Sequence, residues 1–214
     1  MVAVRVYVEG GGPSHGDQEP LRQGFRKLFE KVLGGRAKPK ITACGGRAEA
    51  FADFKRGLKS NPDALCVLLV DSEGPVRDGA ASWDHVHERK GDEWVRPEGT
   101  SEDQIHLMVQ AMEAWLIADP DALETYYGQG FRRAALPGQK NVEQISKKDL
   151  SAALERATRD SKTKGAYRKS HGFQLIGMID PQKVRAASWH AARFFDALAD
   201  HSTDGTSARW PPRR

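Results

Sequence analysis

The sequence contains few cysteines and no long apolar run. Its two cysteines, Cys44 and Cys66, give neither the ligand spacing of a zinc site nor a disulfide framework, so we expect a reduced, cytoplasmic setting. No segment approaches the roughly 20 apolar residues of a membrane helix, and MVAVRVYVEGGG at the start lacks the apolar stretch of a signal peptide. The seven histidines are scattered, without the helical His-x-x-x-His pair that favours zinc.

The composition that is present favours a globular α/β protein. With 214 residues, 39% of them apolar and 29% charged, the chain suits one domain with a small appendage. The net charge is +4, and lysines and arginines concentrate between residues 132 and 183. A basic half beside an acidic site would suit a polyanionic substrate. The alternative is a solvated surface that carries excess positive charge.

Hydrophobic periodicity over the first 75 residues predicts alternating strands and helices. Apolar residues follow strand or helix spacing between glycine-rich turns. The predicted elements are strands at 2–8, 39–43 and 64–70 and helices at 19–33 and 47–58. Short crossovers of this kind imply a parallel, Rossmann-like sheet flanked by helices. We expect the first and third strands to be neighbours, and the uninterrupted ALCVLLV of 64–70 to be buried on both faces.

The rest of the chain is predicted to be mainly helical. Residues 75–103 form a polar loop that is long enough to hold some structure of its own, and 105–109 is either a fourth strand or the first turn of a helix. Further helices are expected at 111–118, 121–127, 147–159, 173–179 and 188–198. These patterns divide the chain into an α/β core (1–120), a helical C-terminal portion packed on it (121–198) and a disordered tail (199–214).

Carboxylates follow two of the predicted strands. Glu9 comes directly after the first strand, and Asp71 and Glu73 come directly after the third, two residues apart on an extended segment. Ligands of parallel sheets bind beyond the carboxyl ends of the strands, and two or three acids suffice for Mg²⁺ or the similar Mn²⁺. Gly10 and Gly11 would let a phosphate approach the backbone amides, although the chain lacks the GxxxxGK[ST] spacing.

The patterns VEGGG at residues 8–12 and VDSEG at 70–74 resemble the Toprim domain of topoisomerases, primases and OLD-type nucleases. That family has a Glu after its first strand and an Asp-x-Asp or Asp-x-Glu pair after a later one. The segment QAMEAWLIAD at 110–119 resembles small stand-alone bacterial Toprim-like proteins of unassigned function near the RloB-like branch, as do ACGGR at 43–47 and KGAYRK at 164–169. The resemblance spans roughly residues 2–198, but this chain has neither the catalytic tyrosine context of a topoisomerase nor a primase zinc module.

Two charged residues near the predicted strand ends are further candidates. Glu113, followed two residues later by Trp115, could position a water molecule beside the metal; the alternative is an acid favoured at the start of a helix. Arg47 opens a helix after two glycines, where it could bind a phosphate. Its alternative role is to pair with a neighbouring acid such as Glu49.

A basic segment later in the chain could contact the substrate. Lys164, Tyr167, Lys169 and His171 lie within eight residues and could bind a nucleic-acid backbone or balance charge in the transition state, with Lys169 the strongest candidate. The alternative is a solvated loop.

The hypothesis that unites these residues is an Mg²⁺- or Mn²⁺-dependent nuclease. Glu9, Asp71 and Glu73 would bind the metal, and the substrate would be DNA or RNA. The resemblance implies a role in bacterial defence or DNA maintenance beside an ATPase partner. Two alternatives stay open, namely a non-catalytic module that docks on an ATPase, with vestigial or purely structural acids, and a phosphohydrolase of small nucleotides.

Overall fold

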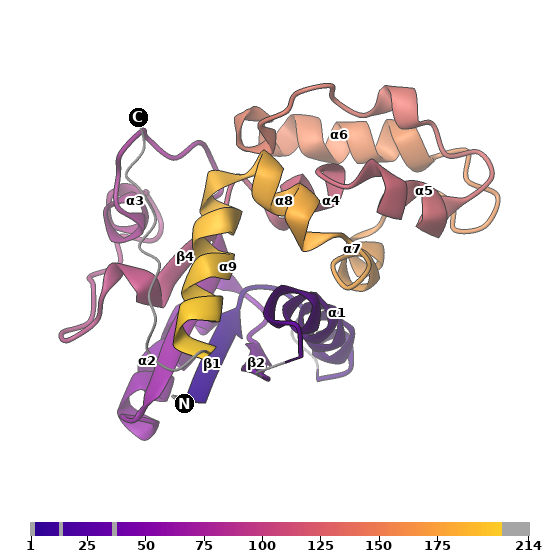
Figure 1. Ribbon diagram of the computed structural model, residues 1–214. Helices are drawn as coiled ribbons and strands as arrows, with labels where there is room; N and C mark the ends of the chain where they lie inside the picture. Colours follow the sequence, from indigo (N-terminus) through magenta and orange to yellow (C-terminus); the bar gives the residue numbers. More distant parts are fainter. Residues whose placement is uncertain (1–2, 13–14, 36–37, 203–214) are drawn as a thin grey trace.

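Four parallel strands form the centre of the protein in a computed structural model, which describes residues 3–12, 15–35 and 38–202 (Figure 1). The strands are β1 (Ala3–Val8), β2 (Lys40–Ala43), β3 (Ala64–Asp71) and β4 (Ile105–Met108). The helices are α1 (His15–Leu33), α2 (Arg47–Ser60), α3 (Ser82–Glu88), α4 (Met112–Ile117), α5 (Pro120–Tyr127), α6 (Lys147–Thr158), α7 (Lys169–Leu175), α8 (Pro181–Ala187) and α9 (Trp189–Ser202). Short 3-10 turns lie at Glu102–Gln104, Arg133–Ala135 and Val142–Gln144.

The sheet has the order β2-β1-β3-β4, with every pair parallel. The predicted α/β class and the predicted pairing of the first and third strands are therefore confirmed. Val8 of β1 aligns with Leu69 of β3, and Asp71 of β3 aligns with Met108 of β4. This register brings the carboxyl ends of β1, β3 and β4 to one edge of the sheet.

Alternate side chains of the central strands enter two different hydrophobic layers. Val67 and Leu69 point into the layer with α1 and α9, whereas Leu68 and Val70 point into the layer with α2 and α3. All four are almost fully buried, and burial of each such side chain contributes about 1.5–3 kcal/mol. The prediction that β3 is buried on both faces is confirmed for all but its first two residues, which are half-buried.

The helical C-terminal portion shares its core with the sheet. Figure 1 shows α5 and α6 at the upper right with α7 below them, while α9 runs along the sheet. Trp115 of α4 is fully buried against Phe194 and Phe195 of α9, at ring-centroid distances of 6.2 and 5.5 Å. One continuous hydrophobic cluster therefore joins β1 and β3 to α4, α6 and α9.

The structure differs from the sequence-based expectations at several boundaries. The polar loop of residues 75–103 contains α3. Of the two alternatives for residues 105–109, the strand is correct, and it is β4. Helix α7 begins at Lys169, four residues earlier than expected, and ends at Leu175 before Gly177. Helix α9 continues to Ser202, past residue 199, where we expected a tail to begin; residues 203–214 lie outside the described part. Across the described ranges, no helix has the length and apolar character that crossing a membrane requires.

Helices α1 and α7 cross in contact at Gly24. A Cβ atom added to Gly24 would lie 2.1 Å from the carbonyl oxygen of Phe173 and 2.4 Å from Cγ2 of Ile176. Real Cβ atoms do not approach other atoms so closely, so a larger residue at this position forces the two helices apart.

We predict that Gly24→Ala lowers the free energy of unfolding by about 1–3 kcal/mol because of this steric conflict, although alanine favours an isolated helix over glycine by about 1 kcal/mol. Urea unfolding of the two proteins measures the difference. Gly138→Ala is the control, because a Cβ at Gly138 meets nothing within 4 Å. Equal or greater stability of Gly24→Ala would show that α7 does not rest on α1 in this way.

Candidate metal centre

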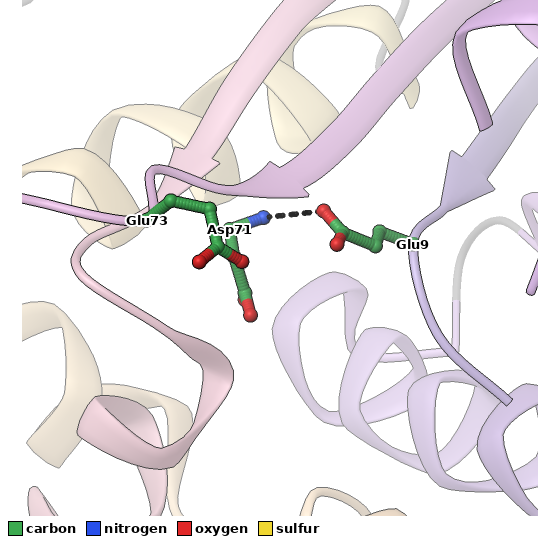
Figure 2. A group of neighbouring side chains, drawn as sticks. All are labelled: Glu9, Asp71 and Glu73. Carbon is green, nitrogen blue, oxygen red and sulfur yellow. Dashed lines mark hydrogen bonds between the residues drawn. The ribbon is translucent and has the colours of Figure 1, made fainter. Parts of the chain in front are cut away.

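Three carboxylates converge at the carboxyl edge of the sheet. Glu9 follows β1, Asp71 ends β3, and Glu73 lies two residues farther on (Figure 2). Each side chain has a carboxylate oxygen that lies within 4.8 Å of a carboxylate oxygen of the other two. The amide of Glu9 donates to the carbonyl of Leu69 at 3.0 Å, so the pairing of β1 with β3 extends as far as Glu9. The expected convergence of the three acids is confirmed.

The backbone at Glu73 differs from the extended segment that we expected. Glu73 has φ of +63°, in the left-handed region that side-chain-bearing residues seldom adopt. Its amide donates to the carbonyl oxygen of Gln110 at 3.0 Å, and the amide of Ser72 donates to that of Met108 at 3.1 Å. These two bonds fix a sharp turn after β3, so the turn rather than strand alternation brings Glu73 beside Asp71. A left-handed conformation at a non-glycine residue costs about 1–3 kcal/mol and often marks a functional site.

Burial disfavours the ionised forms of Asp71 and Glu9. Asp71 is buried, and desolvation, followed by the charges of Glu9 and Glu113, raises its pKa to about 7 against the lowering effect of Lys147. Its Oδ1 atom accepts a hydrogen bond from the amide of Met112 at 2.9 Å. Burial also raises the pKa of Glu9, although the charge of Arg47 opposes that shift. A bound divalent cation would remove this electrostatic penalty.

Arg47 lies in the site but is already engaged by protein groups. Its Nη1 atom donates to Oε2 of Glu9 at 3.0 Å and to the carbonyl oxygen of Asp71, while Nε and Nη2 donate to the carboxylate of Asp92 at 2.6–2.9 Å. The guanidinium also lies 4.9 Å from the ring centroid of Trp94. We expected Arg47 to bind substrate; in the structure it connects Glu9 to the segment between α3 and β4.

Lys147 is a member of the site that sequence reasoning missed. Its Nζ atom lies 2.6 Å from Oε1 of Glu73 and 3.7 Å from Oδ2 of Asp71. Burial lowers the pKa of Lys147, but the hydrogen bond to Glu73 and the charge of Asp71 outweigh that effect and raise it. Lys147 is therefore an ammonium ion that touches two of the three acids. The only signal in the sequence was a positive charge at the start of a predicted helix.

A pocket of about 630 Å³ opens beside the acids. One wall of the pocket is formed by Gly10 and Gly11 together with Gly45. Gly10 and Gly45 exchange two backbone hydrogen bonds of 2.7 and 2.9 Å. Gly11 has φ of +92°, and a Cβ there would lie 2.9 Å from Cα of Gln18. This wall therefore depends on residues without side chains.

Of the other predicted site residues, Glu113 and Lys169 line the pocket and Lys164 does not. Glu113 lines it, and its Oε1 accepts a hydrogen bond of 2.9 Å from the hydroxyl of Tyr167, whose pKa is raised by burial and by the Glu113 charge. Lys169 is exposed at the start of α7 and also lines the pocket. Lys164 does not line it, and its Nζ atom lies 4.7 Å from the ring centroid of Tyr126.

We predict that Asp92→Asn lowers the free energy of unfolding by about 3 kcal/mol, because it leaves the buried charge of Arg47 without its principal counter-charge. The Asp92 side chain is 2% exposed. Thermal or urea unfolding measures the loss, and Glu88→Gln at the end of the preceding helix α3 is the control. Glu88 pairs with Arg77 on the surface, where an ion pair contributes less than about 1 kcal/mol. Similar losses in the two variants would contradict a special role for Asp92.

We predict a pH dependence of metal-free stability that originates in Asp71. Its pKa rises from 3.8 to about 7 on folding, so the folded state binds the proton more tightly than the unfolded state. The contribution of Asp71 to the free energy of unfolding is therefore largest below about pH 4. It falls by on the order of 2–4 kcal/mol as the pH rises through about 7. Unfolding in EDTA across this range measures the slope, which should be smaller in Asp71→Asn. An unchanged slope would mean that Asp71 titrates normally.

Comparison with known proteins places the site within a recognised domain family. A family model described as a domain of unknown function, DUF4276, matches residues 9–199, from Glu9 to the last turns of α9. No curated protein and no solved structure matches the chain.

Proposed function

We propose that this chain, which belongs to the DUF4276 domain family, is a divalent-metal-dependent phosphodiester hydrolase that acts on nucleic acid. The observation that carries the proposal is the group formed by Glu9, Asp71 and Glu73, whose ligand atoms lie within 4.8 Å of one another. Two of the three, Glu9 and Asp71, line the pocket. Two of these acids have raised pKa values, which favours a partner of high positive charge.

The donor atoms fit Mg²⁺ or Mn²⁺. All three candidate ligands are carboxylates, which suit hard cations that keep several water ligands. Cys44 also lines the pocket, but burial raises the pKa of its thiol to about 12, so it stays protonated and is a poor metal ligand. Magnesium or manganese therefore fits this site better than zinc.

Chain residues around the pocket are suited to the remaining tasks of phosphodiester hydrolysis. A bound divalent ion polarises a phosphate and lowers the pKa of a water molecule. The buried carboxylate of Glu113, held by the Tyr167 hydroxyl, can accept a hydrogen bond from an attacking water molecule and orient it. Lys169 at the rim can offset negative charge on the phosphate.

The basic character of the C-terminal half supports a polyanionic substrate. Residues 131–170 contain eleven lysines and arginines but four acidic residues, although the whole chain has a net charge of +4. Some of these charges are paired on the surface, as in Arg132 with Asp160. Arg168 and Lys169 are exposed beside Tyr167, whose hydroxyl donates to Glu113 of the site, and they can contact backbone phosphates without reading sequence.

The resemblance to Toprim proteins extends the proposal to a biological setting. It favours a cytoplasmic enzyme of bacterial defence or DNA maintenance that acts beside an ATPase partner. The two cysteines are free and buried, as expected of a protein from a reducing compartment.

We predict that the purified chain cleaves plasmid DNA or RNA with Mg²⁺ or Mn²⁺, that EDTA abolishes cleavage, and that Asp71→Asn lowers the rate at least about 100-fold, because the variant loses a metal ligand. Gel analysis of the polymers and phosphate release from nucleotides measure the activity. Asp63→Asn is the control, because Asp63 is exposed and precedes the opposite end of the same strand.

The outcomes separate the candidate functions. Cleavage of polymer that depends on Asp71 supports the proposal, whereas phosphate release from nucleotides alone indicates a small-nucleotide phosphohydrolase. Inactivity on every substrate, together with the absence of a metal-induced rise in melting temperature, would support a binding module with vestigial acids.

A further inference from the structure

We propose that Lys147 is a built-in counter-ion of the acidic cluster, which a divalent cation has to displace from Glu73 before it can bind the three carboxylates. The inference rests on the proposed metal site and assigns a distinct role to a residue of α6. On this view Lys147 sets the affinity of the site for metal.

The ammonium of Lys147 and a metal ion would compete for the same carboxylates. The Nζ atom lies 2.6 Å from Oε1 of Glu73 and 3.7 Å from Oδ2 of Asp71, two acids of the group whose ligand atoms lie within 4.8 Å. Metal–oxygen distances of about 2.1 Å would put a divalent ion within a few ångströms of this ammonium. At that separation the two positive charges repel each other strongly.

The two cations beside the cluster differ in their freedom to move. Arg47 is held by three contacts with the buried carboxylate of Asp92 and by the ring of Trp94. The Lys147 side chain is 39% exposed, and it forms ion pairs with the two acids themselves. A lysine has a flexible four-carbon stem. A metal ion would therefore displace Lys147 rather than Arg47.

The backbone of Lys147 is fixed beside the site even if its side chain moves. Its amide donates to the side-chain oxygen of Gln110 at 3.3 Å, and the amide of Glu73 donates to the backbone oxygen of the same Gln110 at 3.0 Å. Ser146 caps α6 by accepting from the amide of Asp149 at 3.1 Å. The displaced ammonium therefore remains tethered near the carboxylates and competes with the metal at high local concentration.

Mn²⁺ binding measured by titration calorimetry at fixed ionic strength tests the proposal. We expect Lys147→Met to lower the dissociation constant for Mn²⁺ about tenfold or more, because it removes the competing charge. Lys147→Arg keeps the charge and should bind Mn²⁺ no more tightly than the wild type. Lys148→Met removes an exposed positive charge from the adjacent position and is the control, with a small change expected.

Melting temperatures distinguish a counter-ion from an ordinary structural ion pair. In EDTA, Lys147→Met should melt below the wild type, because the acids lose a neutralising charge. With saturating Mn²⁺ the difference in melting temperature should vanish, because the bound metal neutralises the carboxylates in both proteins. A structural ion pair would give the same deficit with and without Mn²⁺, and that result would overturn the proposal.

The binding data also separate failure of this inference from failure of the metal site. Wild-type binding of Mn²⁺ with equal or weaker binding by Lys147→Met would overturn the counter-ion role and leave the metal site standing. Failure of both proteins to bind Mn²⁺ would overturn both proposals.

Discussion

The repulsion among three partly buried carboxylates is the constraint around which the site is organised. Glu9, Asp71 and Glu73 converge because parallel strands end at a common edge, and their proximity disfavours the folded state unless positive charge is supplied. Arg47 supplies it at Glu9, and Lys147 supplies it at Glu73. The segment between α3 and β4 contributes through Asp92, which fixes Arg47, so a region that resembles a surface loop in sequence is part of the electrostatic support of the site.

Features that depend on the periodicity of the chain could be predicted from the sequence. The apolar run of β3 and the glycine turn after β1 are local signals, and the rules of parallel sheets place the ends of both strands together. That reasoning is enough to predict that Glu9 lies near Asp71. It is also enough to predict that Trp115 is buried, because every residue of its helix except Glu113 is apolar.

Contacts between residues far apart in the chain could not be predicted in this way. Lys147 is 74 residues from Glu73, and Asp92 is 45 residues from Arg47. No local pattern distinguishes these residues from exposed charges, because the packing of whole helices brings them together. The left-handed backbone of Glu73 likewise depends on the carbonyl of Gln110, a residue of a later segment. Lys169 and Lys164 look alike in sequence, but only Lys169 lines the pocket.

The crossing of α1 and α7 at Gly24 limits the width of the pocket, although Gly24 itself does not line the pocket. Helix α7 contributes Lys169 and Phe173 to the pocket lining, and its distance from the sheet is limited by how closely it can approach α1. A family member with a bulkier residue at this crossing would hold α7 farther out and present a wider cavity behind the same three carboxylates. The range of substrates admitted could thus diverge among relatives through a position that never touches a ligand, while the metal chemistry is retained.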